Sequence, residues 1–154
     1  MSIGKLLQRP VLTLPPDASC IEAARLMDRE EVGAVVVEVE GRPLGMVTDR
    51  DLALRVMAKG LNPKEVRLHE VMTGAPIYLS ERRGLDEFIG YMQEMAVRRI
   101  MAVDAEGRLI GLLSLDDLLL LLAEQLGSLA KVVKRSVSPP PRPAKPLVED
   151  LADD

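Results

Sequence analysis

The residues best suited to bind a ligand or cap a helix are two pairs of a hydroxyl side chain and a carboxylate. The members of each pair are three positions apart. Thr48 precedes Asp51 in Gly-Met-Val-Thr-Asp-Arg-Asp-Leu, and Ser114 precedes Asp117 in Gly-Leu-Leu-Ser-Leu-Asp-Asp-Leu. Each pair stands where an apolar helical pattern begins, so each can form a capping box that satisfies the first free amides of a helix. Such a cap contributes about 1 kcal/mol to stability.

A second interpretation of these pairs is compatible with the first. The N-terminus of a helix offers free amides and a positive dipole potential to an anion, and an adjacent carboxylate can accept two hydrogen bonds from a ribose diol. The spacing therefore leaves two alternatives open: helix capping alone, or capping combined with binding of a ribose-containing anion.

The two motifs belong to an internal repeat. Residues of the same kind recur 66 positions apart, in the pairs Pro10 and Pro76, Gly41 and Gly107, Gly45 and Gly111, Thr48 and Ser114, and Asp51 and Asp117. In the middle of the repeat the spacing falls to 65, as between Val32 and Val97, which one added hairpin residue would produce. A register of this length indicates a duplicated structural unit.

The repeat must position its motifs with a common set of elements. β-branched runs, glycine and proline turns and helical periodicities predict strand, helix, strand, strand, helix in each copy. We therefore expect an α/β (α+β) fold of two tandem β-α-β-β-α units packed about a pseudo-twofold axis, because one unit alone is too small to bury both faces of its sheet. The expected divisions are residues 1–64, 65–128 and 129–154.

The C-terminal region differs in character. Gly127 and Ser128 are expected to interrupt the last helix, which could resume over 129–135. Five of the eleven prolines then lie between Pro139 and Pro146, and acidic residues end the chain. This composition predicts a flexible, disordered tail.

Composition excludes several classes of function. Aromatic residues make up 2% of the chain and the net charge is −4, so neither a base-stacking platform nor a basic field favours nucleic acid. No apolar run reaches the roughly 18 residues needed to span a bilayer. We therefore expect a cytoplasmic protein without nucleic-acid or membrane partners.

The chain also has too few cysteine and histidine residues for the usual catalytic or metal-binding sites. Cys20 is the single cysteine, so it cannot form an internal disulfide, and its apolar surroundings favour a buried small side chain. His69 is the single histidine and has no second ligand at a suitable spacing. We expect no metal, no catalytic residues and no catalytic cofactor, and hence no enzyme.

With its duplicated element order and paired Gly-x-x-Thr/Ser-x-x-Asp motifs, the chain resembles a tandem pair of cystathionine β-synthase (CBS) domains, the Bateman module, over roughly residues 3 to 127. The resemblance implies clefts that bind adenosine derivatives such as AMP, ADP, ATP or S-adenosylmethionine. It assigns ribose contacts to Asp51 and Asp117, and ribose or phosphate contacts to Thr48 and Ser114.

The resemblance also marks basic residues as candidate phosphate ligands. Arg98 and Arg99 lie in a segment where nucleotide-sensing relatives place basic side chains, and arginine suits bidentate phosphate contact. Their alternative role is a solvated strand edge, and Arg50 is a further candidate. The first unit has Gly33 and Ala34 at the matching positions, so we expect unequal occupancy of the two clefts.

These expectations give two hypotheses of function. The first is a non-enzymatic regulatory module that binds an adenine nucleotide or S-adenosylmethionine and signals to an effector protein, whose identity stays open, by conformational change. The alternative is a ligand-free dimerisation scaffold. Both expect a homodimer through helices 48–59 and 114–126, because five consecutive leucines, Leu118 to Leu122, surround the second helix and cannot all be buried by one sheet.

Overall fold

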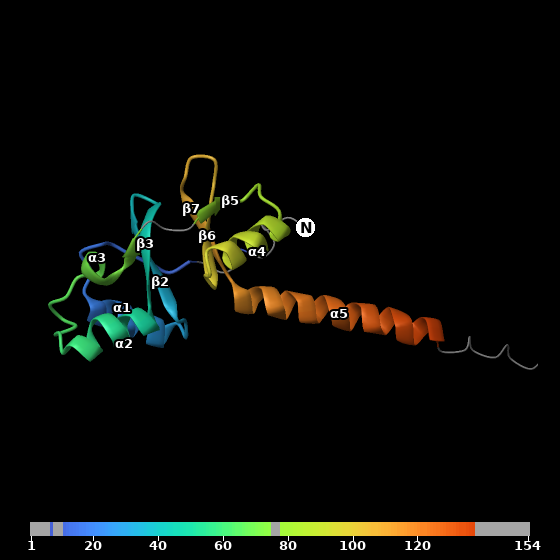
Figure 1. Cartoon of the computed structure of the whole chain (residues 1–154), viewed down its shortest axis with the longest axis horizontal. Helices are drawn as coiled ribbons and strands as arrows, with labels where there is room; N and C mark the ends of the chain where they lie inside the picture. The colour runs from blue at the N-terminus through green and yellow to red at the C-terminus, as the bar shows by residue number, and fades with distance from the viewer. Residues whose placement is uncertain (1–6, 8–10, 75–77, 138–154) are drawn as a thin grey trace, which may run out of the picture. The chain divides into compact units, whose positions relative to one another are not determined.

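Both halves of the repeat fold with the predicted order of elements (Figure 1). The computed structural model describes residues 7, 11–74 and 78–137, so the proline-rich part of the predicted tail lies outside the described residues. The first half contains β1 (Thr13–Leu14), α1 (Cys20–Arg29), β2 (Ala34–Val39), β3 (Arg42–Thr48) and α2 (Asp49–Arg55). The second contains β5 (Tyr78–Ser80), α4 (Leu85–Glu94), β6 (Arg99–Val103), β7 (Leu109–Ser114) and α5 (Leu115–Val137).

Short elements connect the two halves. A 3-10 helix, η2 (Met57–Lys59), follows α2 and ends at Gly60, which has a left-handed backbone with φ of 66°. The connection continues through α3 (Leu68–Val71) and β4 (Thr73–Gly74). The helix that Thr48 begins therefore ends at Arg55, so the predicted helix over 48–59 is too long, and Gly60 ends the 3-10 helix that follows it.

Each half builds one mixed sheet. The first sheet has the order β1-β2-β3-β4, with β1 parallel to β2 and the other pairs antiparallel. The second has the order β5-β6-β7, with β5 parallel to β6 and β7 antiparallel to it. The predicted α/β class, with two units that each combine a mixed sheet and helices, is confirmed.

The repeat extends to strand register. Ala34 pairs with Thr48 in the first half, and Arg99 pairs with Ser114 in the second. Both hairpins carry an irregularity at the matching point, after Val37 and after Ala102. Beyond it, the paired residues Glu38 and Pro43 enclose residues 39–42, whereas the matching pair Val103 and Leu109 encloses residues 104–108. The predicted added hairpin residue is therefore confirmed, and it lies in the second hairpin.

The core is aliphatic, as the low aromatic content requires. Val35, Val37 and Val47 are fully buried in the first half, and Ile100 and Leu113 are fully buried in the second, together with the aromatic Phe88. A capping box in which Ser19 and Glu22 bond reciprocally starts α1. Cys20, the next residue, is 1% exposed, which confirms the buried cysteine, and burial raises the pKa of its thiol.

The expected interruption of the last helix is wrong. Helix α5 runs through Gly127 for 23 residues, from Leu115 to Val137. Ser128 donates its hydroxyl to the Glu124 carbonyl at 3.0 Å, so it bonds within the helix and does not break it. A helical glycine costs only about 1 kcal/mol, which neighbouring leucines and alanines offset.

The chain divides into two compact units, residues 1–117 and 118–154, each considered by itself. Both sheets belong to the first unit, whereas the second contains most of α5. None of the helices in the described ranges combines the length and apolar character that crossing a membrane requires. The predicted divisions at 64 and 128 remain predictions.

Candidate functional site

The first compact unit contains a cleft of about 580 Å³. Clefts of roughly 300 to 1,000 Å³ are the usual size of small-molecule sites. The residues that line it come from both halves of the repeat: Met46, Thr48, Asp49, Arg50, Asp51, Thr73, Ala96, Val97, Arg98, Arg99, Met101 and Asp116. The cleft is therefore large enough for a nucleotide-sized molecule.

The cleft brings together five of the seven predicted site residues. Thr48, Arg50 and Asp51 come from the first motif, whereas Arg99 begins β6 and Arg98 directly precedes it in the second half. Ser114 and Asp117 do not line this cleft. The basic pair thus lies beside the motif of the opposite half, which the linear order of the residues does not indicate.

The first motif forms the predicted capping box at the start of α2. Asp51 Oδ2 accepts from the Thr48 amide at 2.9 Å and from the Thr48 hydroxyl at 2.8 Å, while the Asp51 amide donates to Thr48 Oγ1 at 3.1 Å. The capping interpretation is confirmed for this pair. The cap also fixes the position of the carboxylate at the cleft.

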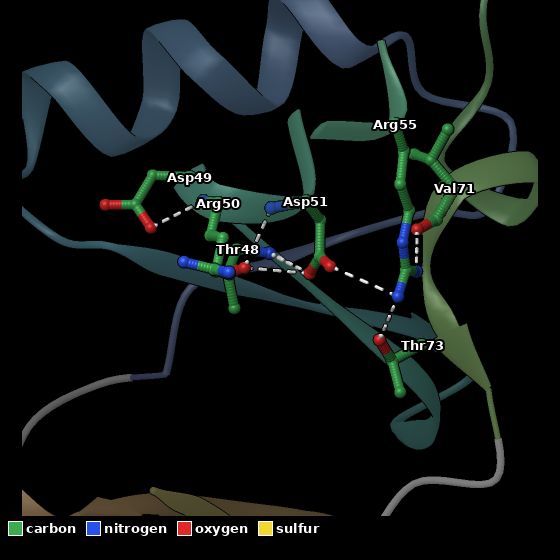
Figure 2. A network of polar contacts seen from close by, with 7 residues as sticks. All are labelled: Thr48, Asp49, Arg50, Asp51, Arg55, Val71 and Thr73. Atoms are coloured by element: carbon green, nitrogen blue, oxygen red, sulfur yellow. Dashed lines mark hydrogen bonds and ion pairs between the residues drawn. The ribbon is translucent and has the colours of Figure 1, made fainter. Parts of the chain in front are cut away.

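The other oxygen of Asp51 is held by Arg55, which the sequence analysis missed. Arg55 Nη2 lies 3.3 Å from Asp51 Oδ1 and donates to Thr73 Oγ1 at 3.2 Å, while Nη1 donates to the Val71 carbonyl at 2.5 Å. Figure 2 shows the guanidinium between the carboxylate and the 71–73 segment. A carboxylate has about four acceptor positions, so about one remains for a ligand.

The second motif forms the same cap without this arginine. Asp117 Oδ2 accepts from the amide and the hydroxyl of Ser114, and the Asp117 amide donates to Ser114 Oγ. The position matching Arg55, 66 residues later, is Leu121. No donor within the described ranges reaches Asp117 Oδ1, so the two carboxylates have different surroundings.

The formal charges of the cleft cancel, because three arginines and three aspartates line it. Arg98 Nη2 lies 3.1 Å from Asp116 Oδ1, and both side chains are largely exposed. Arg50 and Arg99 also line the cleft, and neither guanidinium is hydrogen-bonded or ion-paired to any residue that the structure describes. Two cationic groups are thus available to an anion, and a third is held by a surface ion pair of small energy.

Gly33 explains how Arg99 fits beside the first motif. A Cβ on this glycine would lie 3.3 Å from Arg99 Nη2 and 3.3 Å from Asp49 Oδ2. The missing side chain therefore leaves room for both groups. Arg99 begins β6, which is the middle strand of its sheet, so the strand-edge alternative is wrong for this residue.

Sequence reasoning also missed polar and apolar parts of the lining. Asp49 follows Thr48 directly and Asp116 precedes Asp117, so both were visible as acidic neighbours of the motifs. Thr73 gave no signal, because it lies in the connection between the halves. Met46, Val97 and Met101 give the cleft an apolar wall suited to a flat base or another apolar group.

His69 lies away from this cleft. Its Nδ1 lies 3.1 Å from the Pro16 carbonyl and 3.7 Å from Asp17 Oδ1, and about half of its side chain is exposed. Among the residues that the structure describes, no three His, Cys, Asp or Glu side chains form a group suited to a metal. The absence of a metal remains a prediction.

The fold describes a protein built from two copies of a small α/β unit, with a cleft lined by residues of both copies. The family model described as CBS domain matches residues 3–58 and 68–124. The chain therefore belongs to the CBS domain family, as a tandem pair.

Relatives in sequence support this assignment. The CBS domain-containing protein YhcV of Bacillus subtilis is 33% identical over 117 residues, which are 76% of this chain and 82% of that protein. An uncharacterized protein of Methanopyrus kandleri is 33% identical over 120 residues, 77% of this chain and 61% of that protein. This chain thus spans less than two thirds of the Methanopyrus protein.

Solved structures of CBS domain proteins are similar throughout the repeat. A protein with CBS domains from Burkholderia ambifaria has a TM-score of 0.70 and 29% identity, covering 77% of this chain and 91% of that one. A CBS domain protein from Pyrobaculum aerophilum, complexed with AMP, has a TM-score of 0.70 and 27% identity, covering 76% of this chain and 89% of that one.

Proposed function

We propose that this chain is a non-enzymatic regulatory module that binds an adenine nucleotide in the cleft between Thr48, Asp51 and Arg99. The observation that carries the proposal is the convergence of a ribose-type acceptor with unpaired guanidinium groups in one cleft of about 580 Å³. The AMP complex of the Pyrobaculum relative supports the same class of ligand. Binding that favours one arrangement of the module would change what it contacts.

The charges favour a phosphate-bearing ligand within this class. Arg50 and Arg99 can each donate two parallel hydrogen bonds to phosphate oxygens, and Arg98 can join them by leaving Asp116. S-adenosylmethionine offers one carboxylate to these arginines and no phosphate, so it can engage fewer of the guanidinium groups than a nucleotide can. AMP, ADP or ATP is therefore the preferred ligand over S-adenosylmethionine.

Calorimetric titration with AMP, ADP, ATP and S-adenosylmethionine tests the proposal. We expect Arg99→Ala to weaken binding of the preferred nucleotide by about tenfold or more, because a hydrogen bond to a charged group contributes about 1.5 to 3 kcal/mol. Arg108→Ala is the matched control, since Arg108 is exposed and outside the cleft lining. No heat and no thermal shift with any of the four at millimolar concentration would refute the proposal.

A ligand-free scaffold is the second candidate, and the completed caps favour it. Thr48 and Asp51 already satisfy one another, so they have a structural role without any ligand. The scaffold predicts that Asp51→Asn and Asp117→Asn cost stability equally with and without nucleotide. The sensor predicts that Asp51→Asn also abolishes a nucleotide-induced rise in melting temperature.

Both proposed functions include assembly into a homodimer. The predicted homodimer through helices 48–59 and 114–126 stays a proposal, as does the effector protein that would receive the signal. In the described structure Leu54, Met57, Leu119 and Leu122 are exposed, which is the apolar surplus that motivated the prediction.

A further inference from the structure

Helix α5 carries a row of exposed apolar side chains that continues past the predicted interface. The row comprises Leu115, Leu119, Leu122, Leu126, Leu129 and Val133, and we name these six residues the leucine seam. From Leu119 to Val133 its members are 45 to 67% exposed. Their spacings alternate between four and three residues, which is the a and d pattern of a coiled coil.

The positions beside the seam suit close helix packing. Apart from Asp116, which follows Leu115, the flanking e and g positions hold apolar or neutral residues: Ala123, Ala130, Val137, Leu118, Gln125 and Val132. From residue 118 onward, the charged residues of α5 are Glu124, Lys131, Lys134 and Arg135, all at b, c or f positions away from the seam. A partner helix would therefore meet no charge at the centre of the contact.

We propose that the leucine seam binds the seam of a second copy of this chain, with the two α5 helices antiparallel. In antiparallel pairs each a residue faces a d residue of the partner. Centred on Glu124, this pairing matches Leu115 with Val133, Leu119 with Leu129, and Leu122 with Leu126. All six seam residues then find partners from the same set, which is the self-complementarity that a twofold contact requires.

Residue types and charges favour this orientation. A parallel two-stranded contact prefers β-branched residues at a, but here two of the three a positions, Leu119 and Leu126, are leucines. The first turn of α5 carries Asp116 and Asp117, and the last carries Lys134 and Arg135. An antiparallel arrangement places the acidic end beside the basic end, whereas a parallel one places like charges together.

The mixed polar face distinguishes a second copy from a lipid surface. Helices that lie on membranes concentrate lysine and arginine on the polar face. Helix α5 has its acidic residues, Asp116, Asp117 and Glu124, in its first half and its basic residues, Lys131, Lys134 and Arg135, in its second half. This division matches its own reversed copy better than a uniformly anionic surface.

Sedimentation velocity of the full chain, without nucleotide, tests the proposal independently of the ligand site. Leu126 and Leu120 are matched exposed leucines, at 67% and 62%, but only Leu126 belongs to the seam. At micromolar concentration we expect a wild-type dimer, a monomeric Leu126→Lys variant and a dimeric Leu120→Lys variant. A wild-type monomer, or a Leu126→Lys dimer, would overturn the proposal, as would binding of the wild-type monomer to anionic phosphatidylserine vesicles.

Orientation is tested by cysteine cross-linking in a Cys20→Ala background. A mixture of Leu119→Cys and Leu129→Cys chains, distinguished by a mass tag, should oxidise to mixed dimers, because these positions face each other only in the antiparallel pair. Dimers of Leu119→Cys with itself, without mixed dimers, would show a parallel contact and overturn the proposal. Unchanged melting temperatures of the reduced variants verify that they fold.

Discussion

Arg55 links the Asp51 carboxylate to the connection between the two halves, so its replacement makes a sharp test of the site. In Arg55→Leu the first motif takes the form of the second, where Leu121 occupies the matching position. The change removes the 3.3 Å ion pair to Asp51 and the hydrogen bonds to Val71 and Thr73. We expect the folded state to lose stability.

The magnitude follows from these three contacts. A hydrogen bond from a charged donor contributes about 1.5 to 3 kcal/mol, and a surface ion pair contributes about 0.2 to 1 kcal/mol. The side chain of Arg55 is 39% exposed, so solvent screening places the sum at the lower end, about 2 kcal/mol. For a chain of this size that corresponds to a melting temperature about 4 to 8 °C lower.

Differential scanning calorimetry measures the change, and Arg29→Leu is the matched control. Arg29 and Arg55 are each the last residue of a helix, but the Arg29 side chain is 70% exposed and, among the described residues, pairs only with its neighbour Glu30. The control should shift stability by no more than about 0.5 kcal/mol. Equal melting temperatures for the two variants would refute the reasoning that Arg55 bridges the motif and the connection.

Three further predictions concern packing and titration. Gly45→Ala should lower the free energy of unfolding by about 1 to 3 kcal/mol in urea denaturation, because the new Cβ would lie 2.7 Å from the Thr73 carbonyl in β4. Gly74→Ala should not, because its Cβ would meet no atom of the described residues within 4 Å. Equal denaturation midpoints for the two variants would contradict this. The hydrogen bond from the Ser19 side chain lowers the pKa of Glu22 in the folded state. The ionised Glu22 carboxylate therefore stabilises the fold fully at pH 7, and this contribution is lost as the pH falls through the folded-state pKa. The melting difference between wild type and Glu22→Gln should therefore shrink below about pH 4, and a constant difference would disprove the linkage. Burial raises the pKa of Cys20, so Ellman's reagent should modify it at pH 8 only after guanidinium is added, and rapid reaction of the folded chain would contradict its burial.

The fold was predictable because each of its signals occurs twice. Thr48 with Asp51 and Ser114 with Asp117 mark the same helix start, and the capping boxes form at both places. The 65-residue spacing in the middle of the repeat indicated an added hairpin residue, which the structure places in the second hairpin. Gly127 misled the prediction because helix propensity is a weak local preference that neighbouring residues override.

The site was predictable only in part, because its residues meet through tertiary structure. Arg98 and Arg99 precede the second motif in the chain, yet they line a cleft with the first. The hydrophobic periodicity of a strand or helix predicts the element, but it does not predict which half of the repeat its side chains contact. Thr73 and Arg55 were missed for the same reason: their roles depend on a contact between α2 and the connection, 18 residues apart.

The balance of charge in the cleft bears on the rate at which a ligand could enter. Arg50, Arg98 and Arg99 stand against Asp49, Asp51 and Asp116, so the formal charges cancel. A cleft without net charge offers little long-range steering to an approaching anion. Association should therefore depend weakly on ionic strength, and nucleotides that differ in phosphate number should differ mainly in residence time, through the guanidinium groups that each engages after arrival.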